Sequence, residues 1–185
     1  MKSLFKRFFQ DEEGTASLEF VLVFPVFFGF FLMTYEAGVY STRQVMLEHG
    51  VDVTVREVRI GLIPNPDRDN LRARICDAAR ILPDCLQQLE IELIQKDLSS
   101  PWVALNQTIT CVDRSDLAAV PPDTIDSVGN NELAFLRACV RIDPFIPSSN
   151  LGKAFVASGD NDAAGGSYAL YATSAFVVEP FGADP

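Results

Sequence analysis

The chain has 185 residues and a net charge of −10, from 15 Lys and Arg against 25 Asp and Glu. This length suits one modest domain with an anchoring segment rather than two full domains. The excess of acidic residues argues against a nucleic-acid-binding surface, which needs basic side chains to neutralise phosphates.

A long apolar segment follows a short, charged N-terminus. No side chain from Phe20 to Met33 is charged. With its neighbours from Thr15 to Tyr35, the segment reaches about the 20 residues that cross a hydrocarbon core, so we expect a transmembrane helix. One carboxylate, Glu19, lies near its start. An ionisable group inside a membrane helix is costly and is therefore a candidate functional residue.

The charges around this segment predict its orientation. Lys2, Lys6 and Arg7 are the basic residues that precede it, and basic residues beside a transmembrane helix tend to remain in the cytoplasm. We therefore expect everything after Tyr35 to be exported. A cleaved secretory signal is the alternative, but acidic residues precede the apolar core and the residues after Tyr35 make a poor small-x-small cleavage site.

The helix is expected to continue beyond the membrane as a rod that ends near Ile60. Its apolar positions follow a helical stripe: Val51, Val55, Val58 and Leu62. Alternate valines from position 51 to 55 also fit a strand, but continuity with the anchor favours a helix. Gly61, followed by Pro64 and Pro66, marks the end.

The remaining residues predict a small exported domain. A helix over residues 67–82 has Asp67 or Asp69 as its cap. About four strands follow, at residues 89–93, 108–112, 135–142 and 168–178. We expect Glu90 and Glu92 to lie on a solvent-exposed face of the first strand. The last strand is apolar on both faces, so we expect it to be central in the sheet. The predicted fold class is α+β, with an antiparallel sheet.

Four cysteines, all after the apolar segment, indicate two disulfides in an oxidising compartment. Three pairings are possible. We favour Cys76 with Cys85 and Cys111 with Cys139, because each pair joins neighbouring elements across a short connection. The one histidine, His49, lies on the predicted rod and no Cys-x-x-Cys spacing occurs. We therefore expect no metal site, no cofactor and no enzymatic activity, with an exported enzyme of unfamiliar site as a weaker alternative.

The start of the apolar helix resembles a type IV prepilin signal. Basic residues precede Gly14, and Glu19 is the fifth residue after it, followed by the aromatic Phe20. The string DEEGTASLEFVLVFP at residues 11–25 is similar to TadE-like pseudopilins, of the TadE or TadF kind, of the tight-adherence (Flp-type IV) pilus assembly system.

This resemblance implies a processing site and a set of partners. A prepilin peptidase would cut between Gly14 and Thr15 on the cytoplasmic side of a bacterial inner membrane. Glu19 would then dock against the new amine of another subunit, whereas its simpler interpretation is an interfacial acid at a helix N-terminus. The implied partners are other pilins or pseudopilins and pilus assembly proteins.

The expected organisation has three parts. Residues 1–14 form a cytoplasmic leader, residues 15–62 the transmembrane and extended helix, and residues 63–185 the periplasmic domain. Because major Flp pilins are far shorter than this chain, the resemblance favours a minor component of the pilus system. The alternative is an uncut, single-pass anchored binding or adhesion domain.

Overall fold

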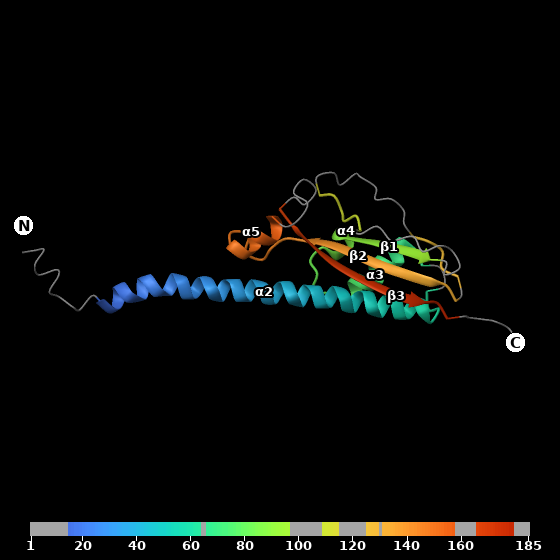
Figure 1. Ribbon diagram of the computed structural model, residues 1–185, viewed down its shortest axis with the longest axis horizontal. Coiled ribbons are helices and arrows are strands. Elements are labelled where there is room, and N and C mark those ends of the chain that lie inside the picture. The colour runs from blue at the N-terminus through green and yellow to red at the C-terminus, as the bar shows by residue number, and fades with distance from the viewer. Residues whose placement is uncertain are drawn as a thin grey trace, which may run out of the picture.

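The computed structural model describes residues 15–63, 66–96, 109–114, 125–129, 131–157 and 166–179. A long helix, α2 (Thr15–Arg59), carries a small domain against its C-terminal half (Figure 1). In chain order the domain adds α3 (Arg68–Ala78), α4 (Cys85–Gln88), β1 (Leu89–Lys96), β2 (Leu133–Ile142), α5 (Asn150–Ala157) and β3 (Tyr168–Val177). The long helix, the antiparallel sheet and two disulfides confirm the predicted α+β fold class.

Helix α2 continues from the apolar segment into the domain, and its helical stripe is confirmed over the valines. Val51, Val55 and Val58 are buried at 1%, 7% and 4% exposure. The stripe does not extend to Leu62, which is 67% exposed, and Ile63 occupies the buried position instead. The reason is that the helix ends at Arg59 and Gly61 turns the chain with a left-handed φ of 72°.

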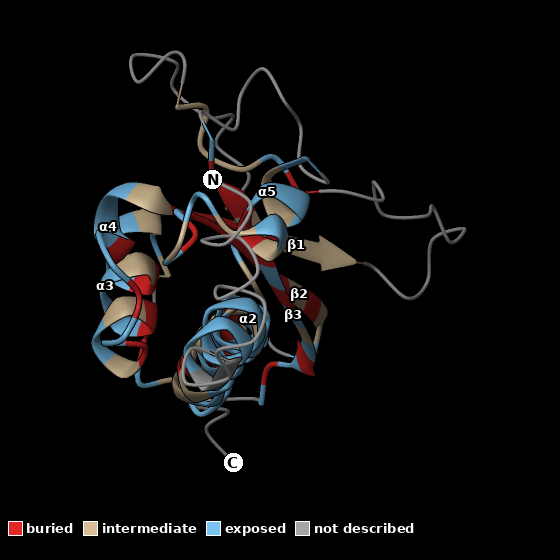
Figure 2. Cartoon of the chain, turned by 90° about the vertical axis from the view of Figure 1, so that its left-hand side faces the viewer, coloured by how far each residue is buried: buried red, intermediate tan, exposed pale blue. Residues whose placement is uncertain are grey.

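The core lies between α2, α3 and the inner face of the sheet, so the C-terminal half of α2 belongs to the globular unit. Figure 2 shows the buried surfaces of these elements turned toward one another. Leu47 of α2, Leu71 of α3 and Leu136 of β2 are fully buried. At the α2–α3 crossing a Cβ on Gly50 would lie 2.8 Å from the carbonyl oxygen of Ile75. Only glycine permits this close approach of the two backbones.

Helix α3 begins where the sequence indicates, because the Asp67 carboxylate accepts a hydrogen bond from the backbone N–H of Asn70 at 2.7 Å. It ends at Ala78, earlier than the predicted residue 82. Residues 79–82 form a turn that places Leu82 in the core at 5% exposure. The disulfide between Cys76 and Cys85 then joins α3 to α4, across a Cα–Cα distance of 5.7 Å.

The sheet has the order β1-β2-β3 with antiparallel neighbours, so β2 is central. The prediction that residues 168–178 form the central strand is wrong. Strand β3 lies at an edge, and its outward-facing Tyr171 and Val177 are 49% and 44% exposed. An edge strand with one solvated face ordinarily shows apolar and polar residues in alternation. Because β3 also has apolar residues on its outward face, its sequence does not show this pattern.

The expected strand at residues 108–112 is also wrong over Ile109–Val112, which is irregular, and residue 108 lies outside the described part. The Cys111–Cys139 disulfide ties this segment to the central strand, with a Cα–Cα distance of 5.3 Å. Arg141 Nε donates to the carbonyl oxygen of Val112 at 2.8 Å. Both contacts hold the segment over the outer face of β2, where it cannot pair with a strand edge.

The first predicted strand is present as β1, but its glutamates do not lie on a solvent-exposed face. Glu90 is 3% exposed, and its Oε1 lies 2.6 Å from Nη1 of Arg68. Glu92 pairs with Arg137 of β2 at 3.4 Å, and both of these side chains are largely buried. The two carboxylates are compensated by arginines from neighbouring elements, which the alternating pattern within one strand does not reveal.

Candidate functional site

The N-terminal half of α2 is the most apolar exposed surface of the described chain. Over residues 17–59 the most hydrophobic window has a mean hydropathy of 2.0, and none of its residues is buried. Its large side chains are exposed, from Leu18 at 64% to Phe31 at 58%. One helix of this length and composition fits a single-pass membrane anchor.

Phenylalanines form a continuous row along this half of α2. The rings of Phe20 and Phe24 stack at 5.1 Å, those of Phe24 and Phe28 at 5.5 Å, and those of Phe28 and Phe31 at 6.4 Å. Steps of four and three residues place them on one helical face. The row therefore presents one aromatic face to whatever surrounds the helix.

Glu19 lies in the first part of α2 and is exposed. It is the one charged side chain in the sequence between Gly14 and Glu36. Thr15 is the first residue of α2, and Gly14 lies outside the described residues. In a lipid environment Glu19 would therefore have an apolar surrounding on its own helix, which makes a compensating cation from elsewhere favourable.

Glu36 forms the junction between the apolar half of α2 and the domain, although its partners lie 110 and 113 residues away in sequence. The residue is only 2% exposed. The backbone N–H of Ile146 donates to Oε1 at 3.3 Å, and the Ser149 hydroxyl donates to Oε2. Ser149 Oγ also accepts from the N–H of Gly152 at 2.8 Å, which caps the start of α5.

Gly152 makes this junction possible. A Cβ at this position would lie 2.6 Å from the carbonyl oxygen of Ile146 and 2.9 Å from Oε1 of Glu36. The absence of a side chain therefore lets α5 approach α2 closely. Sequence reasoning missed this junction. The available signals were a carboxylate directly after the apolar segment and a Ser-Ser-Asn cap signal after Pro147.

One helical turn after Glu36, an aromatic cluster joins α2, α5 and β3. The rings of Tyr40 and Phe155 stack at 4.6 Å, and both lie within 5.7 Å of the Tyr168 ring. Arg43 Nη1 donates to Tyr168 Oη at 3.0 Å and to the carbonyl oxygen of Asp143 at 3.1 Å. Burial raises the pKa of the Tyr168 hydroxyl above its usual value, while the neighbouring Arg43 opposes this shift.

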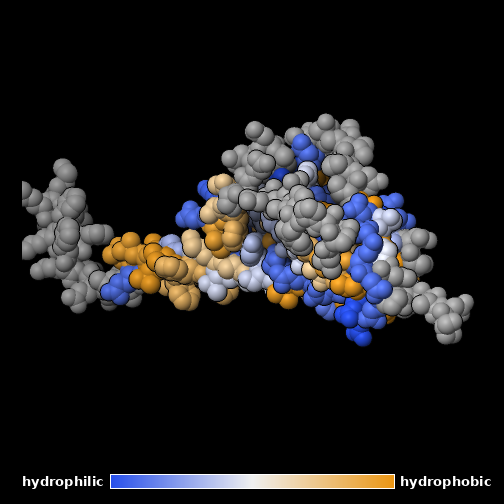
Figure 3. Space-filling view, turned by 45° about the vertical axis from the view of Figure 1, so that its right-hand side comes forward, coloured by the Kyte–Doolittle hydropathy of each residue, from blue (hydrophilic) through white to orange (hydrophobic). Residues whose placement is uncertain are grey.

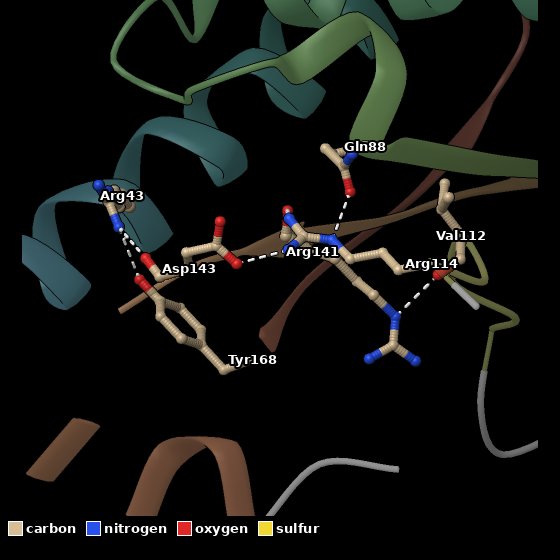
Figure 4. A network of polar contacts seen from close by, with 7 residues as sticks. All are labelled: Arg43, Gln88, Val112, Arg114, Arg141, Asp143 and Tyr168. Carbon is tan, nitrogen blue, oxygen red and sulfur yellow. Dashed lines mark hydrogen bonds and ion pairs between the residues drawn. The ribbon is translucent and has the colours of Figure 1, made fainter. Parts of the chain in front are cut away.

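An arginine network continues from this cluster across the sheet (Figure 4). Arg114 donates to Gln88 Oε1 at 2.8 Å and to the carbonyl oxygen of Arg141 at 3.1 Å, and it pairs with Asp143. A cavity of about 250 Å³ lies here, between Arg43, Arg114 and Arg141. The Arg114 donors are engaged by acceptors of the chain itself, so this network fixes α4, β2 and residues 111–114 together.

The remaining candidate residues do not form a catalytic constellation in the described part of the chain. His49 is exposed on α2. Among the residues that the structure describes, no group of three or more His, Cys, Asp or Glu side chains is placed to hold a metal ion. The four cysteines form the disulfides Cys76–Cys85 and Cys111–Cys139, the pairing that the sequence favoured.

Comparison with known proteins gives a match over most of the long helix α2. The family model described as TadE-like protein matches residues 14–56, which cover Gly14, Glu19 and most of α2. Searches of curated proteins and of solved structures found no match. The match supports involvement of the chain with the Tad pilus system. Over residues 14–56, which hold most of its long N-terminal helix, this chain is similar to the TadE-like family.

Proposed function

We propose that the chain is a minor pseudopilin that acts in assembly of a tight-adherence (Flp-type IV) pilus. The observation that carries this proposal is the TadE-like match, which begins at Gly14 and includes Glu19. The apolar half of α2 supports it, since none of the residues in its most hydrophobic window is buried and a pilin helix needs a free apolar surface to leave lipid and pack with other helices.

In this proposal a prepilin peptidase cuts between Gly14 and Thr15. The cut creates a positively charged amine on Thr15, about one helical turn before Glu19. In a helix bundle without water, the amine of one subunit and Glu19 of another neutralise each other. Because leaving either partner alone in that environment is strongly unfavourable, the pair sets the register between neighbouring helices.

The proposed location is a bacterial inner membrane, with the N-terminus in the cytoplasm and the domain in the periplasm. Lys2, Lys6 and Arg7 support this orientation through the positive-inside rule. The two disulfides lie in the domain, and disulfides persist in the oxidising periplasm. The proposed partners are the prepilin peptidase, other pilins or pseudopilins, and pilus assembly proteins.

A Glu19→Ala variant tests the docking role. We expect the mature chain to form at close to its normal level, because the cleavage site is unchanged, while the amount of pili sheared from cells falls sharply. Glu48→Ala is the matched control, since Glu48 is an exposed acid on the domain half of the same helix. Normal piliation in Glu19→Ala cells would contradict the docking role.

A further inference from the structure

The part of the domain nearest the apolar half of α2 is the turn at residues 144–149 together with α5. Figure 1 shows α5 beside α2 at the end of the domain that faces the N-terminus. The ring of Phe145 packs edge-on against Tyr35, with 5.2 Å between centroids. The adjacent Ile146 N–H reaches Glu36. We call this turn and α5 the membrane-proximal lobe.

The lobe extends the aromatic face of the apolar helix. Tyr35 is one helical turn beyond Phe31, the last ring of the stacked phenylalanine row, and lies on the same face. Phe145 adds a ring from the domain to this face while remaining 55% exposed, and Tyr35 is 48% exposed. In Figure 3 the hydrophobic surface of α2 continues onto the nearest part of the domain.

The charge of the lobe differs from that of the whole chain. Residues 144–157 contain one charged side chain, the exposed Lys153, although the chain carries a net charge of −10. The nearest carboxylate on α2, Glu36, is buried beneath the lobe by Ile146 and Ser149. Asp143, at the start of the turn, is paired with Arg114. The lobe therefore presents aromatic rings and a cation without an unpaired acid.

The position of the lobe along α2 corresponds to the surface of a bilayer that the apolar half of the helix would span. From Thr15 to Tyr35 the helix rises about 30 Å at about 1.5 Å per residue, which equals the hydrocarbon thickness of a typical bilayer. Tyr35 and Phe145 then lie at the boundary between acyl chains and headgroups, where the amphipathic ring of tyrosine is favoured and the apolar ring of Phe145 can contact acyl chains. Lys153 is on the same lobe and can extend its ammonium group toward lipid phosphates.

We propose that the membrane-proximal lobe rests in the headgroup interface of the bilayer that α2 spans. The inference depends on the proposed membrane anchoring of α2. The rings of Phe145 and Tyr35 reach the acyl-chain boundary, and Lys153 faces the phosphates. Because the Glu36 junction fixes the lobe to α2, contact with the lipid surface holds the whole domain in one orientation above the membrane.

The test is fluorescence of single-tryptophan additions to the full chain, reconstituted in phosphatidylcholine vesicles that carry bromine near the headgroup end of the acyl chains. The native Trp102 emission, measured in the unmodified chain, is subtracted. Phe145→Trp reports on the lobe. Leu22→Trp, at a residue 65% exposed in the apolar half, reports on spanning. Leu62→Trp, at a residue 67% exposed just beyond the C-terminal end of α2, is the solvent control.

We expect the added emission of Phe145→Trp and Leu22→Trp to shift to shorter wavelength and to be quenched by bromine, and that of Leu62→Trp to remain unquenched. Quenching of Leu22→Trp with none for Phe145→Trp would overturn the lobe proposal while leaving the anchor intact. Protection of Phe145→Trp from aqueous acrylamide without quenching by bromine would also overturn it, in favour of a protein contact. Lack of quenching at Leu22→Trp would overturn the anchoring itself.

A second measurement checks whether the added tryptophan disturbs the fold. Phe145→Trp should show the same urea unfolding midpoint as the unmodified chain when both are followed by far-ultraviolet circular dichroism. The lobe proposal also predicts that Lys153→Glu, introduced into Phe145→Trp, weakens the bromine quenching of that tryptophan in vesicles containing phosphatidylglycerol. Unchanged quenching would contradict the assignment of Lys153 to lipid phosphates.

Discussion

The hydroxyl of Ser149 donates a hydrogen bond to the carboxylate of Glu36, which is buried on α2 directly after the apolar segment. The bond joins the start of α5 to the long helix. A buried carboxylate is stable only when its oxygens are hydrogen-bonded or paired with a cation. The Ile146 N–H and the Ser149 hydroxyl supply such hydrogen bonds, so the position of the domain on the helix depends on this junction.

Removing the Ser149 hydroxyl is expected to destabilise the attachment of α5. Ser149→Ala leaves a carboxylate oxygen of Glu36 without this donor and also removes the cap of α5, which lowers the free energy of unfolding by about 1–3 kcal/mol. The measurement is urea unfolding of the full chain in detergent, followed by near-ultraviolet circular dichroism. Ser148→Ala, at the exposed neighbouring serine, is the matched control. Equal unfolding midpoints for the two variants would contradict the role of Ser149.

Two glycines of α2 are expected to respond oppositely to the same substitution. Gly50→Ala places a methyl group within 2.8 Å of the Ile75 carbonyl oxygen and 3.2 Å of the Ala79 Cβ. Such overpacking costs about 1–3 kcal/mol. Gly38→Ala meets no atom within 4 Å and gains up to about 1 kcal/mol of helix propensity. Thermal unfolding of both variants tests this, and a stabilised Gly50→Ala would show that α2 and α3 are not closely packed.

The hydroxyl of Tyr168 is expected to make stability depend on alkaline pH. Burial raises its pKa in the folded state, so the folded protein holds this proton more tightly than the unfolded chain. The resulting stability is complete below the unfolded pKa of about 10 and is lost as pH rises through the folded value. Unfolding midpoints measured on both sides of that pH should fall less steeply in Tyr168→Phe than in the unmodified chain.

Tyr171→Phe is the control for this effect, because Tyr171 is 49% exposed on the same strand. At neutral pH, Tyr168→Phe also loses the hydrogen bond from Arg43, at a cost of about 0.5–1.5 kcal/mol. If the unfolding midpoints of Tyr168→Phe and of the unmodified chain fell equally with rising alkaline pH, the Tyr168 hydroxyl would not be the cause of the pH dependence.

The features that could be predicted from the sequence are those set by local patterns. The uncharged run from Phe20 to Met33 predicts the apolar helix, and short connections between cysteines favoured the pairing found. The Asp67 cap is likewise a local signal, because its partner Asn70 lies three residues away. The signals for the helix, for the Asp67 cap and for the Cys76–Cys85 disulfide each lie within a short stretch of sequence, whereas Cys111 and Cys139 are 28 residues apart.

The features that the sequence did not reveal depend on distant partners. Glu36 is recognisable as a buried acid only when the turn at Ile146 and Ser149 is folded beside it. The alternating pattern predicts a solvent-facing Glu90, but in the fold its carboxylate pairs with Arg68 of α3. The position of β3 at the sheet edge follows from pairing order, which an apolar strand pattern does not encode.

The measurement that tests the central claim most directly is N-terminal sequencing of the protein purified from membranes. Cleavage by a prepilin peptidase predicts a mature chain that begins at Thr15, with Glu19 as its fifth residue. Gly14→Leu is the matched variant, and it should accumulate uncut because a bulky side chain replaces the glycine at the cleaved bond. An intact N-terminus at Met1 in the unmodified protein, in cells that assemble pili, would contradict processing after Gly14 and favour a simple membrane anchor.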